Sequence, residues 1–100
     1  MVKHIVMWKL KEEAHGNPKA VNARLIKEKL EALNGKIPGL IHLEVGINFI
    51  GNAANYDVVL YSEFGSAVDL QNYQVHPEHQ AIIPFINAAR LERQAVDYEV

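Results

Sequence analysis

The segment from Val2 to Leu10 constrains the fold more than any other, because apolar or aromatic side chains occur on both of its alternating faces. Successive residues of a β-strand point to opposite sides of a sheet, so such a strand needs neighbours on both sides. One face carries His4, Val6, Trp8 and Leu10, and the other carries Ile5, Met7 and Lys9. We therefore expect this segment to be a central strand of a sheet.

A helix is predicted after the polar stretch Lys11 to Asn17. Asn17 supplies a side-chain acceptor at the helix cap, and Pro18 stands at a first helical position, where no amide hydrogen is needed. Asn34-Gly35 marks the end of the helix, because glycine readily adopts a positive φ. Between these limits, an apolar stripe at helical spacing consists of Ala23, Ile26, Leu30 and Leu33.

The middle of the chain predicts two strands, Leu40 to Ile47 and Tyr56 to Phe64, joined by the hairpin loop Asn48 to Asn55. In the first of these strands the alternation places one apolar set on one face and His42 and Glu44 on the other. The apolar set consists of Ile41, Leu43, Val45 and Ile47.

Two prolines divide the helical region that follows. Ser66 is expected to cap a helix, and the residue before Pro77 avoids helical geometry, so this helix ends near Val75 or His76. Pro77 starts a new helix and Pro84 kinks or breaks it. The last strand is expected from Arg90 to Val100, which completes a β-α-β-β-α-β order.

This order predicts a ferredoxin-like α+β fold, in which an antiparallel four-stranded sheet carries helices on one face. The other sheet face would be polar in a monomer, yet here it is largely apolar. It consists of Ile5, Met7, Val59, Tyr61, Val96 and Tyr98. We therefore expect a homodimer joined through the open sheet faces.

Composition narrows the functional classes. One hundred residues, 49% of them apolar, indicate one globular domain spanning residues 1–100. A net charge of -2 with scattered basic residues gives no footprint for nucleic acid. The chain has no cysteine, no signal-peptide pattern and no apolar run of membrane-spanning length. These features predict a cytoplasmic protein without nucleic-acid or membrane partners.

The stretch Tyr73-Gln74-Val75-His76-Pro77-Glu78-His79 carries the main chemical signal, with a phenol, two imidazoles and a carboxylate in seven residues. It could line a pocket that handles protons, or form a helix boundary at which imidazoles cap backbone groups. We expect His76 to cap the helix before Pro77. His79 stands in the first turn of the next helix, where the dipole favours the neutral ring that a general base requires.

No metal site is expected. His76 and His79 have a spacing of three, but the intervening proline breaks the helical frame, and no carboxylate is placed to complete a zinc site. His15 and His42 are interpreted as solvated or edge positions. No cofactor is expected either, because the glycines form no phosphate-binding pattern.

Several blocks of this sequence resemble the stress-responsive A/B barrel domain (Dabb) family. The first is Val-Lys-His-Ile-Val-Met-Trp-Lys-Leu-Lys at the start, and the second is Ile37 to Gly46. Ser62-Glu63-Phe64, the stretch from Tyr73 to His79, and Val96-Asp97-Tyr98 match later blocks. The resemblance implies a dimeric α+β barrel, and most family members have no assigned reaction.

One branch of similar proteins, the polyketide cyclases of the olivetolic acid cyclase type, implies a cofactor-free reaction. Its two functional histidines match His4 and His79, and its pocket tyrosine matches Tyr73. By this resemblance His79 would be the base, Tyr73 its hydrogen-bonding partner, and His4 the group that holds a substrate carbonyl. This chain departs from that branch in its aliphatic first helix and in Trp8, which faces the expected cavity.

Two interpretations therefore stay open. The first is a homodimer of unassigned activity with, at most, a small apolar or carbonyl ligand between sheet and helices. The second is a cofactor-free polyketide-cyclase-like or other lyase or isomerase enzyme with His79 as the general base. The structure distinguishes them by whether His4 and His79 line one cavity.

Overall fold

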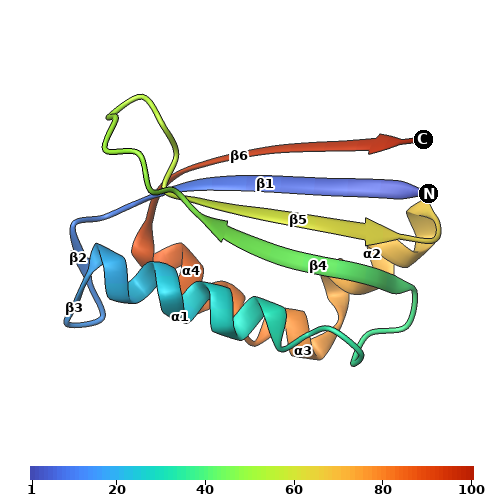
Figure 1. Ribbon diagram of the computed structural model, residues 1–100. Coiled ribbons are helices and arrows are strands. Elements are labelled where there is room, and N and C mark those ends of the chain that lie inside the picture. Colours follow the sequence, from blue (N-terminus) through green and yellow to red (C-terminus); the bar gives the residue numbers. More distant parts are fainter.

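Four long strands form an antiparallel sheet with all the long helices on one of its faces (Figure 1). The computed structural model describes residues 1–100, and the sheet order is β4-β5-β1-β6. The predicted ferredoxin-like fold is confirmed. The long strands are β1 (Val2–Leu10), β4 (Leu40–Ile47), β5 (Val58–Phe64) and β6 (Arg90–Glu99), and the helices are α1 (Lys19–Glu31), α2 (Ala67–Val75), α3 (Pro77–Gln80) and α4 (Ile83–Ala89). None of these helices is long and apolar enough to cross a membrane.

The strand β1 is central, as predicted, because it pairs with both β5 and β6. Its register places His4 opposite Ser62 on one side and opposite Asp97 on the other. The even-numbered residues of β1 are buried against the helices, while Met7 is 37% exposed on the outer face. The alternation read from the sequence thus puts His4 on the helix side.

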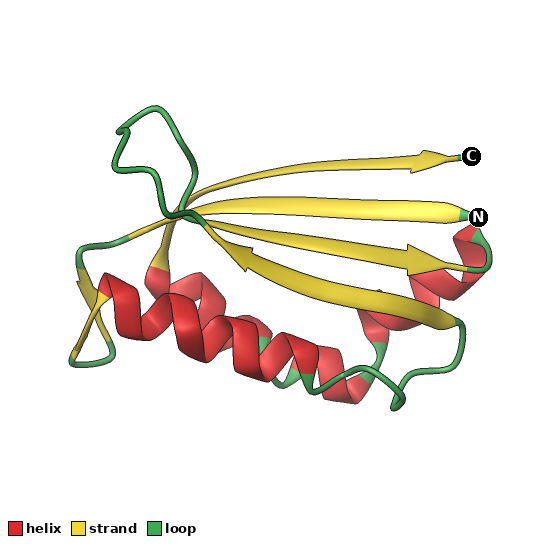
Figure 2. Ribbon diagram, viewed as in Figure 1, coloured by secondary structure: helices red, strands yellow, loops and turns green.

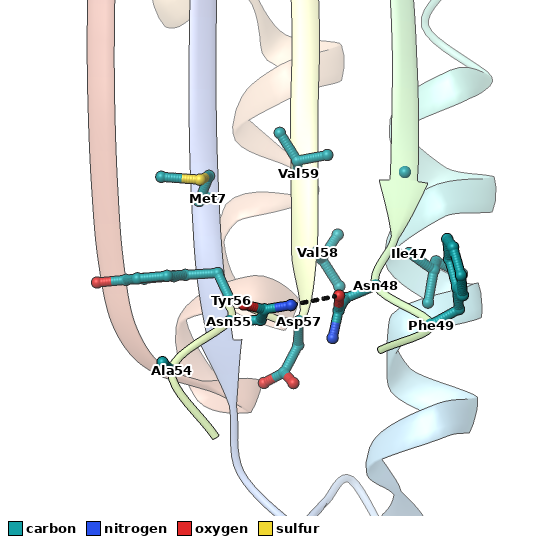
Figure 3. A pocket seen from close by; sticks show the side chains of 11 residues that line it. Met7, Ile47, Asn48, Phe49, Ala54, Asn55, Tyr56, Asp57, Val58 and Val59 are labelled. Carbon is teal, nitrogen blue, oxygen red and sulfur yellow. Dashed lines mark hydrogen bonds between the residues drawn. The ribbon is translucent and has the colours of Figure 1, made fainter. Parts of the chain in front are cut away.

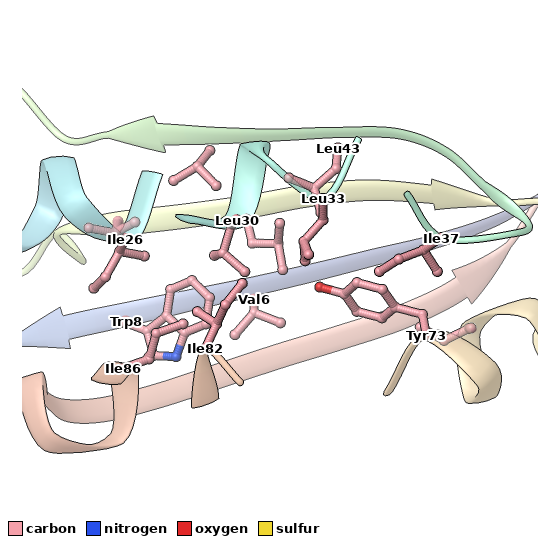
Figure 4. Close-up of a cluster of buried hydrophobic side chains, with 14 of the residues drawn as sticks. Val6, Trp8, Ile26, Leu30, Leu33, Ile37, Leu43, Tyr73, Ile82 and Ile86 are labelled. Atoms are coloured by element: carbon pink, nitrogen blue, oxygen red, sulfur yellow. The ribbon is translucent and has the colours of Figure 1, made fainter. Parts of the chain in front are cut away.

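Eighteen buried apolar side chains between the sheet and the helices form the core (Figure 4). Two buried polar side chains within this layer are satisfied by backbone carbonyls: Ser62 Oγ donates to the His4 carbonyl at 3.0 Å, and Asn22 Nδ2 donates to the Ala14 carbonyl at 2.9 Å. Satisfied groups of this kind cost little when buried. The core is therefore continuous from β4 to α4.

The predicted start of the first helix is wrong. Asn17 and Pro18 form the short strand β3 (Asn17–Pro18), which pairs with β2 (Glu13–Ala14) around a turn at His15 and Gly16. The helix begins at Lys19, and no side chain caps it. Asn17 instead donates from Nδ2 to Asn22 Oδ1 at 3.4 Å. Local hairpin pairing replaces the cap that the Asn-Pro pair suggests.

The strand β4 departs from simple alternation. Its register with β5 shifts between Leu40 and His42, which is the mark of a bulge. Ile41 is consequently 54% exposed, and Leu40 packs against the core in its place. Ile47, at the other end of the strand, is 43% exposed. Only the middle of β4 keeps the predicted buried face. The third predicted strand is also shorter than expected, because Tyr56 and Asp57 belong to the loop.

The helical region after β5 is broken as predicted (Figure 2). Ser66 Oγ accepts a hydrogen bond from the Asp69 amide at 3.2 Å and caps α2. Pro77 is the first residue of the four-residue helix α3, and Pro84 stands in the first turn of α4. The breaks turn the chain back across the sheet and fix where His79 lies.

Substitution at Gly39 tests the packing of the connection into β4. A Cβ there would lie 2.6 Å from the Asp69 Cβ, and the φ of +84° disfavours other residues. Gly39→Ala should therefore lower the free energy of unfolding by about 2–5 kcal/mol in urea denaturation. Gly35→Ala is the matched control, because Gly35 has a φ of +81° but open space around it. The Gly35→Ala variant should lose only about 1 kcal/mol of its free energy of unfolding. Equal losses would contradict this packing.

Candidate active site

A small cavity of about 60 Å³ lies between the sheet and the helices, and both His4 and His79 line it. The two histidines come from opposite layers, because His4 is on β1 and His79 is on α3. The rest of the lining is mainly apolar: Val6, Trp8, Leu30, Leu60, Ile83 and Ile86, with Asn87 and Arg93 as its other polar members. Two imidazoles thus face one apolar space.

His4 is held by a carboxylate on the neighbouring strand. The residue is 4% exposed, and Nδ1 pairs with Asp97 Oδ1, directly across the β1–β6 ladder. A carboxylate only accepts, so Nδ1 carries the hydrogen of this bond. Nε2 makes no hydrogen bond within the chain and is left for the cavity. Sequence reasoning missed Asp97, although pairing the first and last strands in antiparallel order places it near His4.

His79 is oriented by the backbone that precedes it. Its Nδ1 lies 3.2 Å from the Gln74 carbonyl oxygen, which can only accept, so Nδ1 bears the hydrogen and Nε2 bears the lone pair. Burial lowers the pKa of His79 below its ordinary value of 6.5, and the nearby His4 and His76 lower it further. The ring is therefore neutral at pH 7. Burial is the main cause of the lowered pKa of His79, whereas the sequence suggested that the helix dipole would keep the ring neutral.

Tyr73 packs its ring against both histidines. Its ring centroid lies 6.2 Å from that of His4 and 4.3 Å from that of His79. The hydroxyl points into the core (Figure 4) and has no hydrogen-bond partner, and burial raises the pKa of the phenol. Tyr73 thus contacts His79 through its ring and does not make the hydrogen bond that we expected. It supports the imidazoles without lining the cavity.

The other histidines lie outside this cavity. His76 is the C-cap residue of α2, the helix before Pro77, as predicted, because its backbone amide donates to the Tyr73 carbonyl at 3.1 Å. Its imidazole caps α3, since Nδ1 accepts from the Glu78 amide at 3.1 Å. His15 stacks on Phe85 with centroids 4.1 Å apart, and His42 lies 2.9 Å from Glu44. No group of three or more His, Cys, Asp or Glu residues is arranged to hold a metal ion.

A larger hollow of about 480 Å³ lies elsewhere, at the root of the β4–β5 loop (Figure 3). Met7 and Val59 line it, which places it on the face of the sheet away from the helices. It contains no histidine, and Asp57 is its one charged lining residue. The smaller cavity is the candidate site, because two histidines line it.

The fold and site together define a ferredoxin-like α+β domain in which a buried histidine, His4, and a partly buried one, His79, line one cavity between sheet and helices. The chain belongs to the stress-responsive A/B barrel domain (Dabb) family, which it matches over residues 2–100. No curated protein matches the sequence significantly.

Solved structures share this fold. A dimeric protein of unknown function from Bacteroides fragilis is 37% identical, with a TM-score of 0.86, 99% of this chain and 95% of that chain covered. A dimeric ferredoxin-like protein of unknown function from Thermobifida fusca is 22% identical, with a TM-score of 0.84 and coverage of 99% and 90%. A hydroxynitrile lyase from Passiflora edulis is 17% identical, with a TM-score of 0.81 and coverage of 99% and 92%. The last two are similar in fold alone.

Removal of the Tyr73 hydroxyl tests whether it is unpartnered. A buried hydroxyl without a hydrogen bond costs about 1–3 kcal/mol, so Tyr73→Phe should raise the free energy of unfolding by about 1 kcal/mol. Tyr61→Phe is the control, because the Tyr61 hydroxyl bonds Glu63 and Lys3, both at 2.6 Å. That variant should lose stability in the same urea titrations. A loss for both variants would show that the Tyr73 hydroxyl has a partner.

Proposed function

We propose that this protein is a homodimer that binds a small carbonyl compound between sheet and helices and transfers a proton on it without a cofactor. The observation that supports this proposal is that His4 and His79, each held through Nδ1, line one mainly apolar cavity. Two oriented imidazoles beside apolar side chains are an arrangement suited to acid–base catalysis. A histidine with a purely structural role would need only its own hydrogen bonds and no second imidazole lining the same cavity.

In the proposed reaction, His79 is the base. Its neutral Nε2 takes a proton from the carbon beside the carbonyl group, and the electron pair of the broken C–H bond moves to form an enolate. The backbone carbonyl of Gln74 holds Nδ1–H and stabilises the imidazolium that results. Return of the proton, or expulsion of a leaving group, completes an isomerase or a lyase reaction.

The proposed role of His4 follows from its carboxylate partner. When protonated, the ring donates Nδ1–H to Asp97 and presents Nε2–H to the cavity. Such a charged donor would bind the carbonyl oxygen and stabilise the negative charge that develops on it. Asp97 keeps the ring fixed, in the way that a carboxylate orients a catalytic imidazole.

The size of the cavity favours a small substrate. About 60 Å³ corresponds to roughly two waters of liquid volume, whereas sites for drug-sized ligands occupy about 300–1,000 Å³. Trp8, only 5% exposed, fills space beside it. We therefore propose a compound of few carbon atoms in preference to the polyketide chain that the cyclase resemblance implies. The lyase and monooxygenase folds among the similar structures show that this scaffold accommodates enzymes.

Self-association is proposed through the outer sheet face. That face exposes a band of apolar side chains, whose contact with water is unfavourable. Proteins of similar structure are described as dimeric. Its polar end is internally paired, because Lys3 bonds both Tyr61 and Glu63, so burial leaves few groups unsatisfied. The exposed apolar side chains of the face include Met7, Val96 and Tyr98.

A charge on the outer face should disrupt the proposed dimer. Met7→Glu or Val59→Lys would bury a charge without a partner, so sedimentation at micromolar concentration should report monomers where the unmodified protein gives twice the chain mass. Val68→Glu is the matched control, since Val68 is 61% exposed on the helix side. It should stay dimeric. A monomeric unmodified protein with an intact fold contradicts the proposal.

Proton exchange tests the reaction directly. Acetone, butanone, pyruvate and 2-oxobutyrate are incubated with the protein in D₂O, and loss of their α-proton signals is followed by NMR. The unmodified protein should accelerate exchange of at least one compound. His79→Ala should slow it by about 10²–10⁴-fold, because the base is removed, whereas His42→Gln, on the outer face, should not. Absence of accelerated exchange for every compound would contradict the proposed reaction.

The same assay gives a pH dependence of known sign. His79 accepts a proton only when neutral, and burial lowers its pKa below 6.5. The acid limb of the rate profile should therefore have its midpoint below pH 6.5, and the rate should decline as the pH falls through that midpoint. An acid limb with a midpoint above 6.5 would contradict the assignment of His79 as the base.

A further inference from the structure

Two polar residues that line the cavity and are exposed to solvent, Arg93 and Asn87, are not used by the proposed reaction. Arg93 lies opposite Trp8 in the β1–β6 ladder, on the same face of β6 as Asp97. Its guanidinium makes no ion pair and no side-chain hydrogen bond within the chain. An arginine on a strand that carries four acidic or amide neighbours, yet is paired with none, is available to a ligand.

Asn87 supplies a second free donor. Its Oδ1 accepts a hydrogen bond from Arg90 Nε at 3.2 Å, which leaves the Nδ2 hydrogens without an acceptor. Arg93 can only donate, so the polar groups other than histidine offer donors to the cavity. An occupant with acceptors alone matches them best.

The charge of the residues that line the cavity also favours a ligand that only accepts hydrogen bonds. Arg93 is its only residue with a fixed charge, and no carboxylate lines the cavity. The nearby acids are engaged elsewhere, because Asp97 pairs with His4 and Glu92 lies 3.8 Å from Lys9 Nζ. The lining therefore favours an anion over a cation or a neutral molecule of the same shape.

We propose that Arg93 and Asn87 form a carboxylate subsite, and that the ligand of the cavity is a small organic acid. This inference rests on the proposed function and names its substrate class: a short carbonyl compound that carries a carboxylate. Guanidinium and carboxylate have matching bidentate geometry, and the apolar lining holds the short carbon chain. The histidines then act on the carbon next to the carbonyl group.

The test compares propionate with propionamide, which has nearly the same shape and no charge. Dissociation constants are measured at pH 7 by NMR titration of the ¹⁵N-labelled full chain. The unmodified protein should bind propionate about 10- to 100-fold more tightly, since hydrogen bonds to charged groups contribute about 1.5–3 kcal/mol. Arg93→Gln and Asn87→Asp should abolish this preference, and Arg93→Lys should restore part of it. Arg24→Gln, which removes an exposed arginine on α1, is the matched control and should keep it.

The preference between acid and amide, rather than affinity alone, is the readout, because a merely structural arginine would not change it in a folded variant. Equal binding of the two probes by the unmodified protein, or an unchanged preference in Arg93→Gln, would overturn the subsite. Proton exchange without acid preference would leave the proposed reaction standing and remove this inference. Acid preference without exchange would do the reverse.

Discussion

The pairing of β1 with both β5 and β6 is the constraint on which the site depends. It brings the first and last segments of the chain side by side and sets the register that joins His4 to Asp97. A slip of one residue would turn His4 to the outer face and Ile5 into the core. The apolar alternation of β1 opposes that slip, because five buried side chains would have to leave the core together. Packing thus maintains the orientation of the imidazole.

The second determinant is the broken helix that crosses the sheet. A continuous helix from Ser66 to Ala89 would be straight, so the chain could not fold back over His4. Pro77 and Pro84 divide it, and α3 carries His79 to the cavity while α2 places Tyr73 against both rings. Two covalent constraints on backbone geometry therefore produce the convergence of groups distant in sequence.

Much of this arrangement could be predicted from residue patterns. Periodicity of two identified β1 and the middle of β4 and β5, and the prolines located the helix breaks, because these signals are local. The errors arise where another backbone pairing overrides the expected one: Asn17 joins a local hairpin, and Ile41 lies at a bulge in the pairing of β4 with β5. The pairing of Asp97 with His4 and the donors of Arg93 and Asn87 require a register, which composition and spacing do not provide.

The short helix α3 has a further consequence for how a ligand reaches the cavity. It has four residues, none of them buried, and its hold on the rest of the chain consists largely of the His76 cap and the bonds from His79 and Gln80 to the Gln74 carbonyl. Segments with so few buried contacts open at a small fraction of the free energy needed to unfold a central strand. The side of the cavity that carries His79, the proposed base, is thus the side that opens at least cost, while β1 and the ring of His4 stay in place.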